Sequence, residues 1–566
     1  MSTLLTSLAA AGAAALVLPL ALPMAVRRLH LSRAKHPSLT GHVRMGKRVA
    51  AQIPRYAYDG QTFFRSDGAC ECVAACRAAG FSRLADLYGS RFARTRAETE
   101  AVRDGLSDLQ FTTLYRVPFQ YAEHVRKHLG AGAFAAASEG VTLTDLDGNR
   151  FHDLAGSYGV NLLGVDAYRA CLEEGAARVR DLGPVLGPLH PVVAGNVARL
   201  RSISGLDEVS FHMSGTEAVM QAVRLARYHT GKRRIVRFCG AYHGWWGEVQ
   251  PGIGNPVPAR DTLTLAEMSE RTLRVLATRR DIACVLVNPV QAMHPNIGAP
   301  SDSTLVDSSR TAQVDRAAYA AWLTRLREIC TARGIVLILD EVFLGFRLAK
   351  GGAQEYFGVA ADMVTYGKTL GGGLPVGVLC GRAALMRRFR DERPVDICFA
   401  RGTFNAHPYV MGAMSVFLDR LEADAVAALY RDLDATWDAR AGRLNALLAE
   451  AGLPVRVANL TTVWTVLFTR PCRYNWMLQF YLRAEGLALS WVGTGRLIFS
   501  LAYDEAAFED VAARFTAAAT AMRADGWWDG PETTNRDIRR TVLREAAGVR
   551  MREIGARLGF RATERA

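Results

Sequence analysis

Short apolar runs alternate with longer amphipathic segments between about residue 205 and residue 370, and this pattern restricts the possible fold more than any other feature. The strand-like runs cover residues 208–214, 234–239, 284–290, 335–342 and 362–368, and the helical segments cover 215–229 and 317–334. Alternation of this kind favours a mostly parallel sheet with helices on both faces. We therefore predict a large α/β domain over residues 201–405.

Regions on both sides of this domain predict a smaller α+β domain. The segment VTLTDLDGNRFHDL (141–154) alternates apolar and polar residues around Asp-Gly-Asn, as a β-hairpin does. Later patterns predict helices and strands in the order 411–431, 434–452, 463–468, 496–503 and 504–523. Residues 111–200 and 406–530 would form the two parts of the small domain. Residues 31–110 would form an N-terminal extension with helical patches at 69–78 and 81–104.

The net charge of +14 is concentrated at the two ends of the chain. Residues 26–58 contain eight Lys or Arg and no acid, and residues 531–566 contain nine Arg against five acids. The part between them is almost neutral, so no basic recognition face for nucleic acid is expected. We interpret residues 531–566 as a basic, solvated or lipid-facing helical tail.

An uncharged stretch from Leu8 to Val26 precedes Arg27 and Arg28. Three interpretations are open: a cleaved signal peptide, a single membrane span with its basic flank in the cytoplasm, or a helix lying in the membrane interface. The first is disfavoured because the positive charge follows the apolar run. We predict a membrane anchor or interfacial helix over residues 1–30, with the catalytic body membrane-associated on the cytoplasmic side.

Ten cysteines are too few for a disulfide scaffold in a chain of 566 residues and indicate free thiols in a reducing compartment. Cys70, Cys72 and Cys76 lack paired Cys-x-x-Cys spacing and a nearby His. We therefore predict no metal site there and expect small buried side chains on a helix.

Lys368 follows a strand pattern and precedes a glycine-rich turn in YGKTLGGGLPVG (366–377). A lysine in such a position can be desolvated and act as a nucleophile in Schiff-base chemistry. The glycines would also suit a plain loop or a phosphate cradle. A nucleotide-triphosphatase site is disfavoured because the Gly-x-x-x-x-Gly-Lys-Ser/Thr pattern is missing.

Further polar groups stand where strands end or helices begin. Asp340 and Glu341 end the run IVLILDEV, where ligands bind in open α/β sheets, although Asp340 could also be a helix cap or ion-pair partner. The turn Ser214-Gly215-Thr216 opens a helix and would suit either a phosphate or an ordinary cap. Tyr242, in GAYHG, could stack on a flat ring or fill the core.

Together, in this order, the motifs resemble those of class III pyridoxal-5′-phosphate (PLP)-dependent aminotransferases, a group that includes glutamate-1-semialdehyde aminomutase. The matching segments are DLDGNRFHDLAGSYG, MSGTEAVMQAVRLAR, GAYHGWW, ILDEVFLGFR with YGKTLGGGLPVG, and ARGTFNAHP. The resemblance covers about residues 140–410, and the small domain fits more loosely. It implies a fold-type I architecture, PLP as cofactor and a homodimer.

The resemblance also implies roles for individual residues. Lys368 would form the Schiff base and move the substrate proton, and Asp340 would pair with the pyridine nitrogen. Val342 and Tyr242 would contact the two ring faces. The remaining cofactor contacts would come from Ser214, Gly215 and Thr216 at the phosphate, from His243, from Gln291 at the phenolic oxygen, and from Thr403 at the phosphate of the neighbouring subunit.

Substrate contacts are harder to assign. An arginine fork suits a substrate carboxylate, and Arg496 and Arg116 are candidates, although both could be structural. Tyr158 is a third candidate contact. Many relatives have Glu-Pro-Val where this chain has Asn288-Pro289-Val290, so a charge that orders this loop is missing. The segments VNPVQAMHP, GGAQEYFGV and GTFNAHP resemble aminotransferase modules of polyketide and peptide synthases.

We expect transfer of an amino group between an amine or amino-acid donor and a carbonyl acceptor, on a hydrophobic or acyl substrate. Two alternatives use the same site, namely intramolecular transfer as in an aminomutase, and racemisation. A further alternative is a catalytically inactive, membrane-tethered interaction protein. The presence of Lys368, Asp340 and Ser214-Gly215-Thr216 argues against the last of these.

Overall fold

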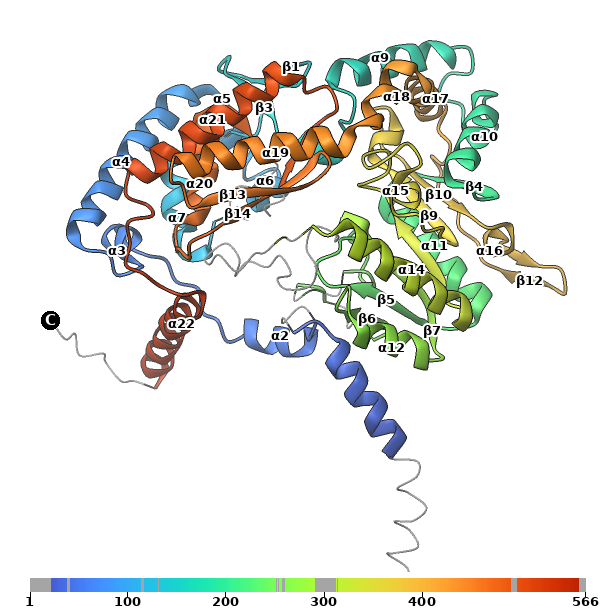
Figure 1. The fold of residues 1–566 in the computed structure, drawn as a ribbon, viewed down its shortest axis with the longest axis horizontal. Coiled ribbons are helices and arrows are strands. Elements are labelled where there is room, and N and C mark those ends of the chain that lie inside the picture. Colours follow the sequence, from blue (N-terminus) through green and yellow to red (C-terminus); the bar gives the residue numbers. More distant parts are fainter. Residues whose placement is uncertain are drawn as a thin grey trace, which may run out of the picture.

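The computed structural model describes residues 22–558 apart from 38–40, 113–116, 131, 251, 253, 257–259, 291–311, 313 and 490–495. A domain built on a large sheet lies beside a smaller domain of helices and short strands (Figure 1). Chain segments before and after the large domain both contribute to the smaller one. The site is therefore built on the large domain and bordered by the small one.

A seven-stranded sheet forms the centre of the large domain, in the order β4-β10-β9-β8-β7-β5-β6. Its strands are β4 (Glu208–His212), β5 (Arg234–Phe238), β6 (Thr262–Leu265), β7 (Ile282–Val287), β8 (Val336–Asp340), β9 (Met363–Gly367) and β10 (Gly377–Gly381). Strands β6, β5, β7, β8 and β9 run parallel to one another, and β10 is antiparallel to both β9 and β4. The prediction of a mostly parallel sheet is confirmed. The apolar pattern did not predict β6 or β10.

Helices cover both faces of this sheet because every central strand is buried on both sides. Along β8, Leu337 and Leu339 belong to the larger apolar cluster, which contains side chains of α14 (Arg316–Arg333). Val336 and Ile338 belong to the second cluster, which contains side chains of α11 (Gly215–Thr230). Alternate residues of a strand point to opposite faces, so α11 and α14 lie on opposite faces of the sheet.

The remaining helices of the large domain lie around the large sheet and at its junctions with the small domain. They are α8 (Gly156–Gly159), α9 (Val165–Arg178), α10 (Val192–Ser204), α12 (Glu270–Thr278), α15 (Gly352–Phe357), α16 (Ala383–Met386), α17 (Pro408–Glu422) and α18 (Asp424–Arg431). Most residues of α17 are buried. A hairpin of β11 (Phe389–Arg390) and β12 (Arg393–Ile397) projects from the edge of the domain, as Figure 1 shows.

The small domain contains two short sheets and three helices. One sheet has the order β1-β2-β3-β15 (Ala135–Glu139, Thr142–Asp145, Arg150–Asp153, Leu487–Ala488), and the other is β13-β14-β16 (Val455–Leu460, Val463–Phe468, Arg496–Ile498). The helices are α19 (Leu433–Glu450), α20 (Leu478–Ala484) and α21 (Glu505–Ala524). Strands β2 and β3 pair antiparallel, as the hairpin motif predicts.

The N-terminal extension packs into the small domain rather than forming a separate unit. Its helices are α2 (Val43–Ala50), α3 (Gly60–Arg65), α4 (Glu71–Arg91), α5 (Ala93–Val102) and α6 (Ser107–Thr112), and α7 (Phe119–His128) follows it in the small domain. Phe63 of α3 is fully buried, with its ring 5.5 Å from that of Tyr121 and 6.5 Å from that of Trp527. Aromatic residues from both ends of the chain therefore share one core.

Helix α22 (Asn535–Arg557) forms most of the basic tail, and it is anchored to the small domain. Glu545 accepts a hydrogen bond from Arg473 at 2.9 Å, and the Arg473 side chain is only 2% exposed. Ile538 and Ala546 are buried. The interpretation of a merely solvated tail is therefore wrong for the inner face of this helix, which carries one acid for a buried arginine.

The apolar N-terminal segment lies largely outside the described residues, because residues 1–21 are not described. A helix covers residues 22–34, and the chain then reaches the sheet edge, where Lys35 bridges Leu265 of β6. Within the described part of the chain, no helix is long and apolar enough to cross a membrane. The predicted spanning helix is therefore not found there.

Cys70 and Cys72 depart from the expectation of free, buried thiols. The structure joins them in a disulfide at the start of α4, and both residues are exposed, as is Cys76. The other described cysteines are free thiols, most of them buried. Backbone proximity at the beginning of α4 brings the pair together, which their spacing in sequence does not reveal. The described residues contain no cluster of three or more His, Cys, Asp or Glu placed to hold a metal ion.

Candidate active site

Lys368 and Asp340 stand at the same edge of the central sheet. Asp340 is the last residue of β8, and Lys368 follows Gly367, the last residue of the neighbouring parallel strand β9. Asp340 is paired with Thr365 in the β8–β9 register. The carboxyl ends of parallel strands are the usual ligand-binding edge of such a sheet. Lys368 also has a φ of 43°, a strained value for a residue with a side chain.

The environment of Lys368 favours its neutral amine. Burial lowers the pKa of Lys368, the Asp340 carboxylate opposes this shift, and Arg347 adds to it, so the pKa stays below its ordinary value. The Nζ atom lies 5.4 Å from the centre of the Phe343 ring. A lysine with a lowered pKa has a larger fraction of the unprotonated, nucleophilic form near neutral pH.

Asp340 is held by three groups. His243 Nδ1 lies 2.7 Å from Asp340 Oδ2, and the Val342 backbone N–H and the Thr365 hydroxyl each donate to Oδ1 at 3.2 Å. Asp340 and His243 are 2% and 1% exposed. Burial lowers the pKa of His243, against the raising effect of Asp340, so the ring is neutral at pH 7. An ionised carboxylate can only accept, so the ring proton lies on Nδ1.

The N-terminus of α11 forms a close-packed cradle at this edge. Ser214 caps the helix by accepting from the Glu217 N–H at 3.3 Å. A Cβ at Gly215 would lie 2.5 Å from Val342 Cγ1, and a Cβ at Gly244 would lie 2.4 Å from Thr216 Oγ1. Only glycine fits at these two positions. Free backbone N–H groups and a hydroxyl at a helix N-terminus favour an anion such as phosphate.

Tyr242 borders the same space from the loop after β5. Its side chain is 57% exposed, and burial of its inner part together with Asp340 raises its pKa. Asn288 is buried, and its Nδ2 donates to the Tyr242 backbone oxygen at 3.3 Å. A neutral amide thus holds the Tyr242 backbone beside this space.

A left-handed turn at residues 156–159 forms the wall on the small-domain side. Ser157 and Tyr158 have φ values of 46° and 57°, and a Cβ at Gly159 would lie 2.6 Å from Phe343 Cε2 and 3.5 Å from Lys368 Cδ. Buried Arg347 donates to the Gly159 oxygen at 2.9 Å. Residue types alone gave no signal for Gly159, Phe343 or Arg347, although all three lie inside the segments that carry the family resemblance.

Arg496 is the first residue of β16, and Ile498 is its last. Ile498 packs against the 156–159 turn so closely that a Cβ at Gly156 would lie 2.8 Å from the Ile498 backbone oxygen. Burial lowers the pKa of Arg496 to about 10. Its Nε is buried and has no hydrogen-bond partner within the described residues.

Three other residues predicted for the site are not placed at it. Thr403 lies in an exposed loop outside the sheet. Gln291 and Arg116 lie outside the described residues.

The residues present fit PLP. Lys368 supplies an amine, Asp340 supplies a buried carboxylate for a ring nitrogen, and the α11 N-terminus supplies the anion cradle. The Val342 side chain packs against Gly215 of the cradle, where a Cβ would lie 2.5 Å from Val342 Cγ1. Val342 also lies beside Gly367, the residue before Lys368. A flat, phosphorylated aldehyde needs these three chemical groups around one space, with apolar or aromatic side chains toward its faces.

Comparisons with known proteins agree with this chemistry. The sequence profile of the family "Aminotransferase class-III" matches residues 124–518. The glutamate-1-semialdehyde 2,1-aminomutases of Nitratidesulfovibrio vulgaris (strain DSM 19637 / Miyazaki F) and Geotalea daltonii are 35% and 31% identical over 365 and 376 residues. These matches cover 61% and 63% of this chain, and 79% and 81% of the relatives.

The fold agrees as well. A solved structure described as a transaminase with PLP bound has a TM-score of 0.60 and 26% sequence identity, and the match covers 77% of this chain and 98% of that one. The family profile spans more than half of the sequence and both domains that border the site. The chain therefore belongs to the class III aminotransferases and is a PLP-dependent enzyme.

Proposed function

We propose that this enzyme transfers an amino group between an amine or amino-acid donor and a carbonyl acceptor, with Lys368 as the catalytic base and cofactor anchor. The observation that carries the proposal is the placement of Lys368 and Asp340 at adjacent strand ends beside the α11 cradle. The lowered pKa of Lys368 suits both roles, since an anchor needs a neutral amine and a base must accept a proton.

PLP, when bound, supplies an electron sink for the bonds at the reacting carbon and carries the amino group between two half-reactions. Asp340 would accept a hydrogen bond from the ring nitrogen and keep it protonated. His243 holds that carboxylate through its Nδ1–H. Lys368 Nζ would take the proton from the substrate carbon and return it to the C4′ position of the cofactor. One flexible side chain can reach both positions.

Arg496 is the proposed partner of a substrate carboxylate. Its guanidinium lies on the strand that packs against the 156–159 turn, and no carboxylate of the described residues forms an ion pair with it. A partly buried arginine without a counter-ion is suited to an anionic ligand. This favours amino acids or keto acids as one of the two substrates. Tyr158, at the centre of the turn, would contact the substrate from the side opposite Tyr242.

A homodimer would complete the cofactor site. Thr403 is exposed, and apolar side chains that precede it in the chain are exposed as well, with Val395 at 93%, Phe399 at 69% and Ile397 at 57%. An apolar surface of this kind is typical of an interface between subunits. We propose that a second copy covers it and that Thr403 then reaches the phosphate of the other subunit's cofactor.

A second candidate function is intramolecular transfer, because the relatives reported above are named glutamate-1-semialdehyde 2,1-aminomutase. The same cofactor site would serve both reactions. An aminomutase would convert its substrate into a positional isomer without a second substrate, whereas a transaminase would move the donor's labelled nitrogen onto a separate acceptor molecule. Mass spectrometry of the products from a ¹⁵N-labelled donor separates the two.

For the N-terminus we propose contact with an anionic membrane surface. Leu22, Met24 and Leu29 are exposed on the helix at residues 22–34, next to Arg27 and Arg28. Apolar and basic side chains on one helix favour the lipid interface. Co-sedimentation with anionic vesicles, compared between the full chain and a chain that lacks residues 1–30, tests this.

The decisive experiment for the amino-transfer function is spectroscopic. The purified enzyme with PLP should be yellow, should lose this colour on addition of an amine donor, and should regain it with a carbonyl acceptor. Borohydride reduction should attach the cofactor to Lys368, and Lys368→Ala should abolish turnover and attachment. Protein that binds no PLP, or that is labelled at another lysine, would refute the assignment.

A further inference from the structure

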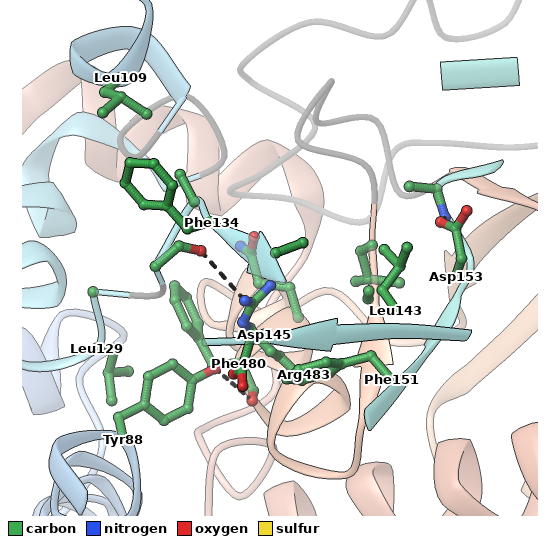
Figure 2. Close-up of a pocket in the computed structure, with 18 of the residues that line it drawn as sticks. Tyr88, Leu109, Leu129, Phe134, Leu143, Asp145, Phe151, Asp153, Phe480 and Arg483 are labelled. Carbon is green, nitrogen blue, oxygen red and sulfur yellow. Dashed lines mark hydrogen bonds between the residues drawn. The ribbon is translucent and has the colours of Figure 1, made fainter. Parts of the chain in front are cut away.

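A cavity of about 560 Å³ lies between the N-terminal extension and the small domain. Figure 2 shows its lining, with Leu109, Leu129, Phe134 and Phe480 on one side and Leu143 and Phe151 across from them. Its volume is that of a pocket for a small organic ligand. The lining contains none of the residues that the sequence analysis assigned to the cofactor.

Part of the lining lies before the segment that the family profile matches. Tyr88 of α4, Leu109 of α6 and Val117 precede residue 124, where the match to the family profile begins. The Tyr88 hydroxyl donates to the Phe480 backbone oxygen at 2.9 Å and so ties α4 to α20 across the cavity wall. The extension thus forms one wall of a cavity whose other walls belong to the shared fold.

Two of the charged side chains that line the cavity, Arg483 and Asp145, are engaged by the protein itself. Arg483 lies over the Phe151 ring, with its guanidinium carbon 5.1 Å from the ring centre, and it also donates to the Gly132 oxygen at 3.4 Å. Asp145 accepts from the backbone and side chain of Asn149 at 2.9 Å each. Most of the side chains left to contact a ligand are hydrocarbon, so the cavity favours an apolar ligand.

The cavity and the Lys368 site share one wall. Ala155, Ser157 and Tyr158 line the cavity, and Gly159, the next residue, packs against Phe343 and the Lys368 side chain. Tyr158 is 41% exposed. The cavity and the Lys368 site therefore border the same short turn.

We propose that this cavity holds the hydrocarbon tail of the substrate, so that the enzyme acts on amines or carbonyl compounds with a long aliphatic chain. This inference rests on the amino-transfer function proposed above. It assigns a specificity role to the extension and to α7, namely that α4, α6 and α7 select substrates by the length of the tail.

The test is a chain-length series of propylamine, hexylamine and decylamine as donors, with pyruvate as acceptor and the holoenzyme as catalyst. In the unaltered enzyme kcat/KM should rise by about fourfold for each added methylene that enters the cavity. Ala135→Trp, at an exposed position of β1 that lines the cavity, should lower the ratio of decylamine to propylamine activity by at least about tenfold. Leu143→Trp should do the same from the neighbouring strand.

The matched control is Ala136→Trp, on the same strand, exposed and outside the cavity lining. It should keep the chain-length ratio of the unaltered enzyme. A flat chain-length profile in the unaltered enzyme, or equal ratios in Ala135→Trp and Ala136→Trp, would overturn the proposal.

A binding measurement separates this inference from the proposed function. N-phenyl-1-naphthylamine, a neutral apolar fluorophore, should bind the holoenzyme, be displaced by 1-decanol, and bind Ala135→Trp at least about tenfold more weakly. If no amine alters the cofactor spectrum while this binding pattern holds, the amino-transfer function fails and the apolar cavity stands. If amines react but the fluorophore binds both variants equally, the function stands and the tail site is wrong.

Discussion

His243 Nδ1 lies 2.7 Å from Asp340 Oδ2, and both side chains are almost completely buried at the carboxyl end of β8. A neutral imidazole in this position donates one hydrogen bond to the carboxylate without adding a second charge. Asp340 is thereby kept in one orientation. This is the requirement for a carboxylate that must hold a proton on a ring nitrogen.

Loss of the His243 hydrogen bond should weaken catalysis without removing the cofactor. We expect His243→Phe to lower kcat/KM by roughly tenfold to a hundredfold, which corresponds to one hydrogen bond to a charged group of about 1.5–3 kcal/mol. The separate variant Asp340→Ala should lose more activity than His243→Phe, because it removes the carboxylate itself. Steady-state kinetics with a saturating acceptor measures both. His243→Asn, whose amide can still donate, should recover part of the loss, and an Asn variant as weak as Phe would contradict this role.

Asp340, Lys368 and the Ser214-Gly215-Thr216 cradle could be found from sequence because each marks the end of a strand or the start of a helix, which are local properties. Gly159 and Arg347 could not, because their contact joins residues 188 positions apart. The β10 strand was also missed, since an antiparallel strand inserted between β9 and β4 interrupts the regular strand–helix alternation.

Lys368 should react with PLP at a lower pH than an ordinary lysine. Its pKa is lowered by burial, so the neutral amine is already abundant below the usual lysine pKa of about 10.4. The rate at which apoprotein incorporates PLP, trapped by borohydride, should rise with pH and level off below that value. A profile that levels off only near the ordinary lysine pKa would contradict the buried setting.

The Asp340 carboxylate works in the opposite direction, since it favours the charged form of Lys368. Asp340→Asn should therefore move the same incorporation profile to lower pH. An unchanged or upward-shifted profile would show that the two groups do not interact. The amount of enzyme labelled at the plateau provides the control for cofactor binding.

Glu341 should make the folded state less stable as pH rises. Burial, with a smaller contribution from Asp340, raises the pKa of this carboxyl from 4.5 to about 8, although the Ala353 N–H donates to it at 2.6 Å. Between these two pKa values the folded state keeps a proton that the unfolded state has lost. Stability should fall as pH increases from 5 to 8, by up to about 1.4 kcal/mol per pH unit.

Glu341→Gln removes this titration and still offers an oxygen to the Ala353 N–H. The free energy of unfolding of the variant, measured by chemical denaturation at pH 5 and pH 8, should therefore fall less over this range than that of the unaltered protein. Parallel pH dependences in the two proteins would show that Glu341 does not carry a raised pKa.

The packing of the two chain ends was the part of the fold least accessible to sequence. The extension shows helical patterns, but Phe63 meets Trp527 across more than four hundred residues, and no local pattern encodes such a contact. The packing of α22 was likewise not visible in the sequence, because its surplus of arginine suggested a solvated helix. One acid of its inner face, Glu545, pairs with the buried Arg473, and Ile538 and Ala546 of this helix are buried.

Glu545 should therefore contribute far more to stability than other acids of α22. It accepts hydrogen bonds from Arg473 and from Tyr56 and Tyr58 of the extension, and it is 25% exposed. Glu545→Ala would leave Arg473 buried without its counter-ion, at a cost of about 3 kcal/mol in the free energy of unfolding.

Glu553→Ala is the matched control in the same helix. Its partner Arg550, at 3.0 Å, is 35% exposed, so loss of this pair should change stability by less than about 1 kcal/mol. Chemical denaturation of the holoenzyme measures both variants. Equal effects would mean that α22 is not anchored through Arg473. A large loss for Glu545→Ala alone, with the PLP spectrum unchanged, would show that the tail stabilises the small domain and its contact with the extension without touching the cofactor.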